Sequence, residues 1–223
     1  YICNLVLRQF MTKLSVNINK IATLRNARNE NYPNLLKTAQ DILSFGAQGI
    51  TVHPRPDERH VRYSDVYELK KNINSELNIE GNPIKKFIDL VNDVKPDQVT
   101  LVPDSEHAIT SNSGWDTITN FSYLNDIKKE FKSNSIRVSI FIDPNINMVE
   151  GAKKLNADRI ELFTGPFAKE FYLNRSEAVK DYVKCSKIAN EINIDINAGH
   201  DLNQHNLLFF SKSVKNIKEV SIG

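Results

Sequence analysis

Cysteine and long apolar runs are both scarce in this sequence. Only two cysteines occur, Cys3 and Cys185, which are too few for a disulfide framework and offer no metal-binding spacing. We therefore expect a reducing compartment, the cytoplasm. No apolar run is long enough to cross a bilayer. No Gly-x-Gly-x-x-Gly motif follows a predicted strand, so the sequence gives no support to a dinucleotide-binding open sheet.

A strong excess of either charge is also missing. The chain has 29 basic and 27 acidic residues, for a formal net charge of +2. This balance gives no general affinity for nucleic acids or membrane surfaces. The hydrophobic fraction of 40% and the charged fraction of 25% are ordinary for a soluble globular protein.

The 223 residues are enough for one large domain or two small ones, and no Pro-, Gly- or Ser-rich linker divides them. Regular patterning begins only after Met11, so we interpret residues 1–10 as a non-native or disordered leader and residues 11–223 as a single domain. Residues 221–223 stop where a strand should pass into a loop. We therefore expect the domain to lack its last loop and helix.

Short apolar strands alternate with helical patterns along the whole chain. The predicted strands are 14–18, 50–53, 77–80, 98–102, 136–142, 157–163, 192–197 and 219–222. Apolar residues at helical spacing predict helices at 35–43, 65–72, 84–94, 115–132, 146–155, 176–190 and 204–211. Residues 20–28 are interpreted as a basic loop and 103–114 as a long polar loop.

This strand–helix alternation favours an α/β fold with a parallel sheet. Eight such units indicate a closed (β/α)8 TIM barrel, for which about 250 residues is typical. A doubly wound open sheet is the structural alternative.

Polar side chains gather where the predicted strands end, which is the active-site face of such a barrel. The richest stretch follows the second strand, where His53, Arg55 and His60 lie in a loop stiffened by two prolines. We expect the site to draw on strand-end residues, whereas Asp143 and Glu161 could equally be interior or capping groups. The strand-end set is Asn17, Asn19, Lys20, His53, Arg55, His60, Glu80, Asp143, Glu161, Asn197 and His200.

These residue types suit proton transfer on an anionic substrate. Histidine titrates near neutral pH without help. Glu80 follows Leu77 and Ile79 on a buried strand, where burial raises the pKa of a carboxyl enough to make it a useful base. Arg55 can hold a phosphate group through two parallel hydrogen bonds.

Three stretches together resemble the pyridoxine 5′-phosphate synthase family of barrel enzymes. They are residues 16–28 (VNINKIATLRNAR), 49–60 (GITVHPRPDERH) and 196–200 (INAGH), and residues 101–103 and 141–143 match as well. The resemblance implies a condensation of 3-amino-2-oxopropyl phosphate with 1-deoxy-D-xylulose 5-phosphate. Its products are pyridoxine 5′-phosphate, inorganic phosphate and water. It also implies a homo-oligomer, usually an octamer, with no metal and no organic cofactor.

The resemblance further implies roles for individual residues. Glu80 and His53 would be general bases, and His200 would be the general acid. The residues that would bind the aminoketone phosphate are Asn17, Arg28, Asp201 and Gly223. The residues that would bind the pentulose phosphate are Asn19, Lys20, Arg55, His60 and Thr110.

The chain departs from the family pattern at three places. Much of the family has Asp-His where this chain has Asn19-Lys20, and this change preserves binding more easily than proton transfer. Many members have glycine in place of Asp201. The family also continues beyond Gly223 with a histidine and a final helix, so we expect a polypeptide that ends there to be inactive or poorly folded.

Three other functions stay open at this stage. A metal-dependent barrel hydrolase could use His53, His60, Glu80 and His200, although the first strand lacks a His-x-His pair. A Schiff-base aldolase needs a lysine inside the barrel at a strand end, and Lys20 is predicted to lie in a loop. A phosphosugar-binding module without turnover would need only the anion-binding residues.

Overall fold

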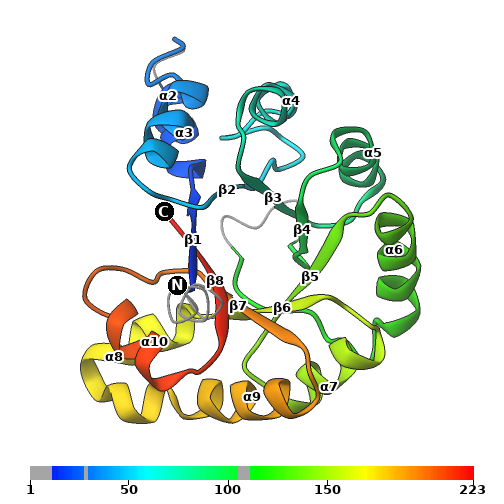
Figure 1. Cartoon of the computed structure of the whole chain (residues 1–223), viewed down its shortest axis with the longest axis vertical. Coiled ribbons are helices and arrows are strands. Elements are labelled where there is room, and N and C mark those ends of the chain that lie inside the picture. The colour runs from blue at the N-terminus through cyan, green and yellow to red at the C-terminus, as the bar shows by residue number, and fades with distance from the viewer. Residues whose placement is uncertain (1–11, 28–29, 105–110) are drawn as a thin grey trace, which may run out of the picture.

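In the computed structural model, residues 12–27, 30–104 and 111–223 are described. Eight parallel strands form a closed barrel in the order β1 to β8, surrounded by helices (Figure 1). This confirms the predicted (β/α)8 architecture. The strands are β1 Lys13–Asn17, β2 Gly49–Val52, β3 Glu76–Gly81, β4 Gln98–Leu101, β5 Arg137–Ile142, β6 Arg159–Phe163, β7 Asp195–Gly199 and β8 Ile217–Ile222.

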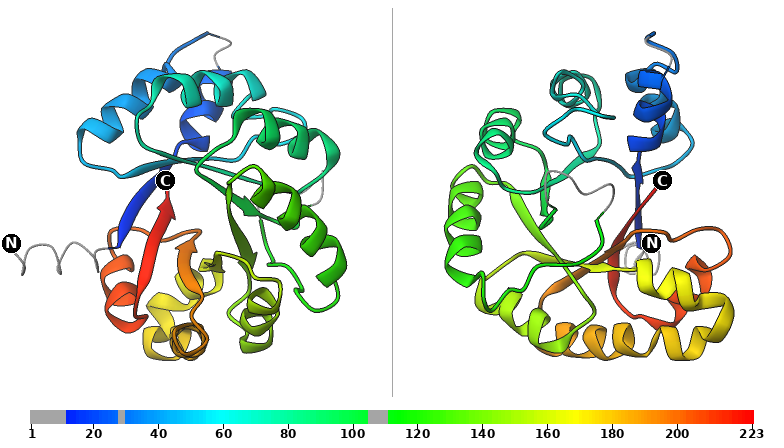
Figure 2. Two further views of the ribbon diagram at one scale, coloured as in Figure 1. Left: turned by 45° about the vertical axis from the view of Figure 1, so that its right-hand side comes forward. Right: turned by 180° about the vertical axis from the view of Figure 1, so that it is seen from behind.

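The helices form an outer ring that follows the strands around the barrel (Figure 2). Within the described residues they are α2 Asn19–Ala27, α3 Leu35–Ser44, α4 Tyr63–Asn72, α5 Lys85–Val94, α6 Phe121–Ser133, α7 Ile146–Lys154, α8 Gly165–Ala178, α9 Lys180–Glu191 and α10 Leu207–Ser213. In this part of the chain, no helix is long and apolar enough to cross a membrane.

The barrel closes where the first and last strands pair. β1 and β8 run parallel, with Leu14 opposite Val220 and Val16 opposite Ile222. The two strands lie side by side in Figure 2. Because every strand then has two neighbours, no exposed sheet edge remains among the described strands.

The main apolar core lies between the barrel and its helices. Strand residues such as Ile50, Leu77 and Ile160 are fully buried and pack in one cluster with helix residues such as Leu124 and Phe210. Successive side chains on a strand point to opposite faces. The apolar strand residues therefore occupy the outward positions, and a different set of side chains occupies the inward positions.

The inward positions are largely polar, in contrast to the branched apolar residues that usually fill such barrels. Arg159 Nη1 on β6 donates hydrogen bonds to Gln98 Oε1 and Asn197 Oδ1, each at 3.2 Å. It also lies 3.5 Å from Glu219 Oε2 on β8. Gln98 Nε2 on β4 also contacts Glu219 Oε1 on β8 at 3.5 Å, and a contact between these two strands requires side chains that cross the inside of the barrel. Buried polar groups in such a network hold one another in fixed positions.

The structure corrects the interpretation of residues 20–28 as a loop. Residues 19–27 form helix α2, of which only Ala22 and Arg25 are buried. Arg25 stays buried because Nη1 and Nη2 contact the two Asp65 carboxylate oxygens at 2.7 and 2.9 Å. Because a charged arginine occupies the buried face of α2, a search for apolar residues at helical spacing does not detect this helix.

Other helix boundaries also differ from the prediction. Helix α8 was missed, because Phe167 is its only buried residue, and the helix predicted at 176–190 begins at Lys180. Helix α6 begins at Phe121 instead of residue 115, because Asp116 holds the preceding turn by accepting from the backbone N–H groups of Ile118 and Thr119. The expected leader at residues 1–10 lies outside the described residues.

Candidate active site

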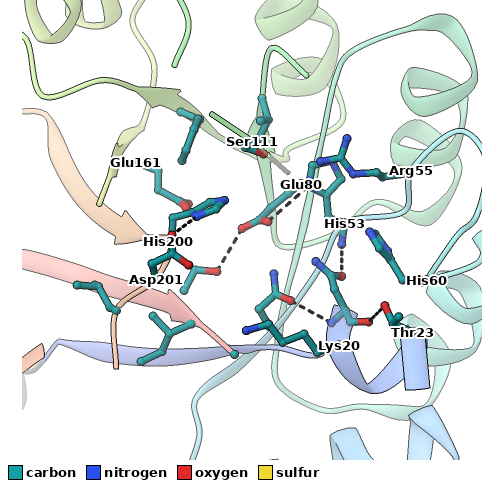
Figure 3. A pocket seen from close by; sticks show the side chains of 18 of the residues that line it. Lys20, Thr23, His53, Arg55, His60, Glu80, Ser111, Glu161, His200 and Asp201 are labelled. Atoms are coloured by element: carbon teal, nitrogen blue, oxygen red, sulfur yellow. Dashed lines mark hydrogen bonds and ion pairs between the residues drawn. The ribbon is translucent and has the colours of Figure 1, made fainter. Parts of the chain in front are cut away.

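A cavity of about 440 Å³ opens at the carboxyl ends of the strands (Figure 3). Every strand contributes a residue from its middle, from its carboxyl-terminal half or from just beyond its end. The lining residues are Asn17, Asn19, Lys20, Thr23, His53, Arg55, His60, Glu80, Val102, Ser111, Phe141, Glu161, His200, Asp201, Leu202, Asn203, Ser221, Ile222 and Gly223. The position of the cavity agrees with the face predicted from the sequence.

Glu80 and His53 face each other across part of this cavity. Glu80 Oε2 lies 3.9 Å from His53 Nδ1, and Glu80 Oε1 accepts a hydrogen bond from Ser221 Oγ at 3.2 Å. Burial, assisted by the charges of Asp104 and Glu219, raises the pKa of Glu80 to about 8. Burial, with the nearby Arg55 charge, lowers the pKa of His53 well below 6.5. At neutral pH the imidazole is therefore uncharged and able to accept a proton.

Glu161 is a second buried carboxyl group in the same cavity. Thr100 Oγ1 contacts its Oε2 at 3.5 Å. Burial, together with the charges of Glu80 and Glu219, raises its pKa well above 4.5. A Cβ atom on Gly199 would lie 2.4 Å from Glu161 Oε1, so glycine at this position leaves room for the carboxyl group. Glu161 is thus an interior group that also reaches the cavity.

His200 lies on the side of the cavity opposite His53, close to Glu161 and Asp201 (Figure 3). Its ring stands edge-on to Phe163, with the centroids 5.1 Å apart. His200 and Asp201 both have positive φ angles, 91° and 59°. The left-handed conformation at position 201 explains in physical terms why glycine suits this site, and aspartate tolerates it better than most residues.

Arg55 and His60 form one wall of the cavity. Arg55 is only 4% exposed, and its Nη2 donates to Asp104 Oδ2 at 2.9 Å. His60 Nδ1 accepts a hydrogen bond from the Val61 backbone N–H at 2.9 Å, so in the neutral ring the hydrogen is on Nε2. Burial and the neighbouring Arg55 and Arg59 charges lower the pKa of His60 to about 4. His60 is therefore uncharged at neutral pH.

The first turn of helix α2 forms another wall. Asn17 Oδ1 accepts from the Asn19 backbone N–H at 3.0 Å, and Asn19 Oδ1 accepts from the His53 backbone N–H at 2.9 Å. Asn19 therefore ties the start of α2 to the residue that follows β2. Lys20 lies in a helix and not in the predicted loop, and it is exposed at the cavity.

The structure brings together ten of the twelve predicted site residues. The other two, Arg28 and Thr110, lie outside the described residues. Asp143 does not line the cavity, because it accepts a hydrogen bond from the Gly114 backbone N–H at 3.1 Å. Ser111, Phe141 and Ser221 line the cavity but were not predicted. Phe141 and Ser221 lie near strand ends, but the sequence does not say which face of a strand turns inward, and nothing in the sequence marks Ser111.

No group of three or more His, Cys, Asp or Glu side chains in the described part of the chain is arranged to hold a metal ion. The four residues considered for a metal-dependent hydrolase therefore do not form a ligand set in this geometry. Among the described residues, Lys20 is the one lysine that lines the cavity, and it lies on α2 beyond β1 and not on the inside of a strand.

Residues 14–223 match the family model described as pyridoxal phosphate biosynthesis protein PdxJ. The chain belongs to the PdxJ family. It is 61% identical over 213 residues to a pyridoxine 5′-phosphate synthase from Christiangramia forsetii and 59% identical to one from Flavobacterium johnsoniae. Each alignment covers 96% of this chain and 90% of the relative. The family resemblance predicted from the sequence motifs is thereby confirmed.

Solved structures of other enzymes share the barrel of this PdxJ-family chain. An orotidine 5′-monophosphate decarboxylase from Methanocaldococcus jannaschii has a TM-score of 0.61 at 14% identity, covering 96% of this chain and 89% of that one. A phosphoribosylanthranilate isomerase from Thermotoga maritima has a TM-score of 0.58 at 14% identity, covering 95% of this chain and 86% of that one. At such low identity these likenesses show the fold alone.

Proposed function

We propose that the chain is a pyridoxine 5′-phosphate synthase. It would condense 3-amino-2-oxopropyl phosphate with 1-deoxy-D-xylulose 5-phosphate and release pyridoxine 5′-phosphate, inorganic phosphate and water. The observation that carries the proposal is the convergence of Glu80, His53 and His200 on one cavity in a chain of the PdxJ family. The relatives that carry this name align over nearly the whole chain.

The proposed roles follow from the state of each group. His53 and Glu80 act as general bases, and His200 acts as the general acid. His53 is uncharged at neutral pH because burial lowers its pKa, so its free ring nitrogen can take a proton. The raised pKa of Glu80 makes its carboxylate, once ionised, a stronger base than an exposed one. A ring-closing condensation needs such transfers at the amine, at carbon and at the departing oxygens.

We assign anion binding to residues in the walls of the cavity and to Arg28 and Thr110, which lie outside the described residues. We assign the pentulose phosphate to Asn19, Lys20, Arg55, His60 and Thr110. We assign the aminoketone phosphate to Asn17, Arg28, Asp201 and Gly223. Arg55 is held by a buried carboxylate, so its guanidinium is already oriented before an anionic group arrives.

We also propose that the enzyme is a cytoplasmic homo-octamer, as the family resemblance implies. We assign the most exposed of the large apolar side chains to contacts between subunits: Tyr32, Phe45 and Leu173 are 73%, 85% and 81% exposed. Light scattering coupled to size-exclusion chromatography measures the mass directly. A species of one or two chains would contradict the proposed assembly.

Product formation tests the proposed activity. The full chain is incubated with both phosphorylated substrates, and pyridoxine 5′-phosphate is detected by absorbance and mass spectrometry alongside released phosphate. We expect equal amounts of both products, and none when either substrate is omitted. Tight binding of the substrates without product would instead indicate a phosphosugar-binding module.

A further inference from the structure

Asp104 is a buried carboxylate that lies just outside the cavity and faces three of the side chains that line it. The residue is 8% exposed and follows β4 by three positions. Its Oδ2 atom accepts from Arg55 Nη2 at 2.9 Å and from Ser111 Oγ at 2.8 Å. The same oxygen lies 3.5 Å from His53 Nε2. One carboxylate oxygen therefore faces a guanidinium, a hydroxyl and an imidazole.

The backbone around Asp104 is also fixed. Asn82 Nδ2 donates to the Asp104 carbonyl oxygen at 2.6 Å, and the Val102 backbone N–H donates to the Gly81 carbonyl oxygen at 2.9 Å. These contacts attach the segment to the end of β3, the strand that carries Glu80. The carboxylate is thus held in place by the barrel itself.

The two ring nitrogens of His53 face different acids. Nε2 faces Asp104, and Nδ1 faces Glu80 at 3.9 Å. A carboxylate that already accepts from an arginine offers only lone pairs, so it favours a hydrogen on the nitrogen beside it. The hydrogen of the neutral ring then belongs on Nε2. The lone pair of Nδ1 is left to point toward Glu80.

We propose that Asp104 is a positioning residue that holds His53 in its Nε2–H tautomer and orients the Arg55 guanidinium. His53 Nδ1 is then the nitrogen that takes a proton from the substrate. This role rests on the proposed synthase activity of the same cavity. The 3.5 Å separation is longer than a typical hydrogen bond, and catalytic hydrogen bonds often shorten only when substrate binds.

Replacing Asp104 by asparagine tests the proposal, because an amide can donate its own hydrogen toward His53 Nε2. The tautomer is measured by nitrogen NMR of the full chain carrying nitrogen-labelled histidine. The His53 signals are assigned as those that are missing from a His53→Gln sample. We expect the Nε2–H tautomer in the wild type and its loss in Asp104→Asn. We also expect kcat to fall by on the order of 100-fold through His53. KM for the pentulose phosphate should rise about tenfold through Arg55.

Two further variants separate positioning from stability. Asp104→Glu keeps a carboxylate and should retain the Nε2–H tautomer with partial recovery of kcat. Asp158→Asn is the matched control, because Asp158 accepts from the Val138 backbone N–H at the opposite end of the barrel, and it should change neither tautomer nor kinetics.

An unchanged His53 tautomer in Asp104→Asn overturns the positioning role, as does an unchanged kcat. A wild type that makes no product but shows the Asp104-dependent tautomer overturns the proposed function and leaves the positioning of His53 standing. The two failures are therefore distinguishable.

Discussion

At the scale of single residues, the catalytic side chains were predicted from their positions at the ends of strands. His53, Glu80 and His200 could be predicted to meet because the carboxyl ends of parallel barrel strands share one face. Glu161 could not be assigned, because its role depends on whether the β6 register turns it inward. Asp104 could not be found either, since its contact with His53 arises only when the chain after β4 passes beside the chain after β2.

The raised pKa of Glu80 predicts the pH dependence of the rate. A base is active in its ionised form, and burial raises the pKa of this carboxyl to about 8. We therefore expect kcat/KM to increase with pH between 6 and 8 and to level off above that range. Initial rates across a series of overlapping buffers measure the profile. A rate that is flat or decreasing over this range would contradict the role of Glu80 as a base.

At the scale of helices and strands, apolar periodicity predicted the strands well and the helices unevenly. It works where an element buries an apolar stripe, as α5 does with Phe87, Leu90 and Val91. It fails for α2, whose buried face includes Arg25, and for α8, which buries Phe167 alone. Both helices are stabilised by contacts that the sequence does not display as a pattern.

The Arg25–Asp65 pair should therefore contribute strongly to stability. Replacing Asp65 with alanine leaves the Arg25 guanidinium buried without its carboxylate, so we expect the free energy of unfolding to fall by about 3–5 kcal/mol. Urea denaturation followed by circular dichroism measures the change. In the control Asp89→Ala, an exposed pair with Lys85 is lost, and the expected change is within about 0.5 kcal/mol. Equal effects of the two substitutions would contradict this account.

At the scale of the whole molecule, the barrel has an apolar outer layer and a polar interior. The alternation of strands and helices was enough to predict the closed barrel. The interior could not be predicted, because both faces of a barrel strand are buried and the sequence does not say which face turns inward. Buried carboxyl groups in this interior, Glu80, Glu161 and Glu219, all have raised pKa values, chiefly because of burial.

These carboxyl groups predict how global stability changes with pH. Their pKa values are higher in the folded state than the value of about 4.3 in an unfolded chain, so the folded state binds more protons. For Glu80, whose pKa in the folded state is about 8, the stabilisation is fully present below about pH 4.3 and is lost as pH rises toward 8. His53 and His60 have lowered pKa values and oppose this trend only below about pH 6.5.

Between pH 6.5 and 8 we therefore expect the free energy of unfolding to decrease as pH rises. Urea denaturation at several pH values measures this slope. Glu80→Gln should reduce the slope, whereas Glu191→Gln, on the exposed end of α9, should not. A free energy of unfolding that increases over this range would show that the interior carboxyl groups titrate differently.

The central claim is that Glu80 acts as a general base, whereas other residues that line the cavity bind the substrates. The most direct measurement compares Glu80→Gln with the wild type, using calorimetry for binding of 1-deoxy-D-xylulose 5-phosphate and product assays for turnover. We expect similar affinities, within about threefold, and a loss of turnover of at least about 100-fold, the contribution of a general base. Full turnover in the Glu80→Gln variant would contradict the account.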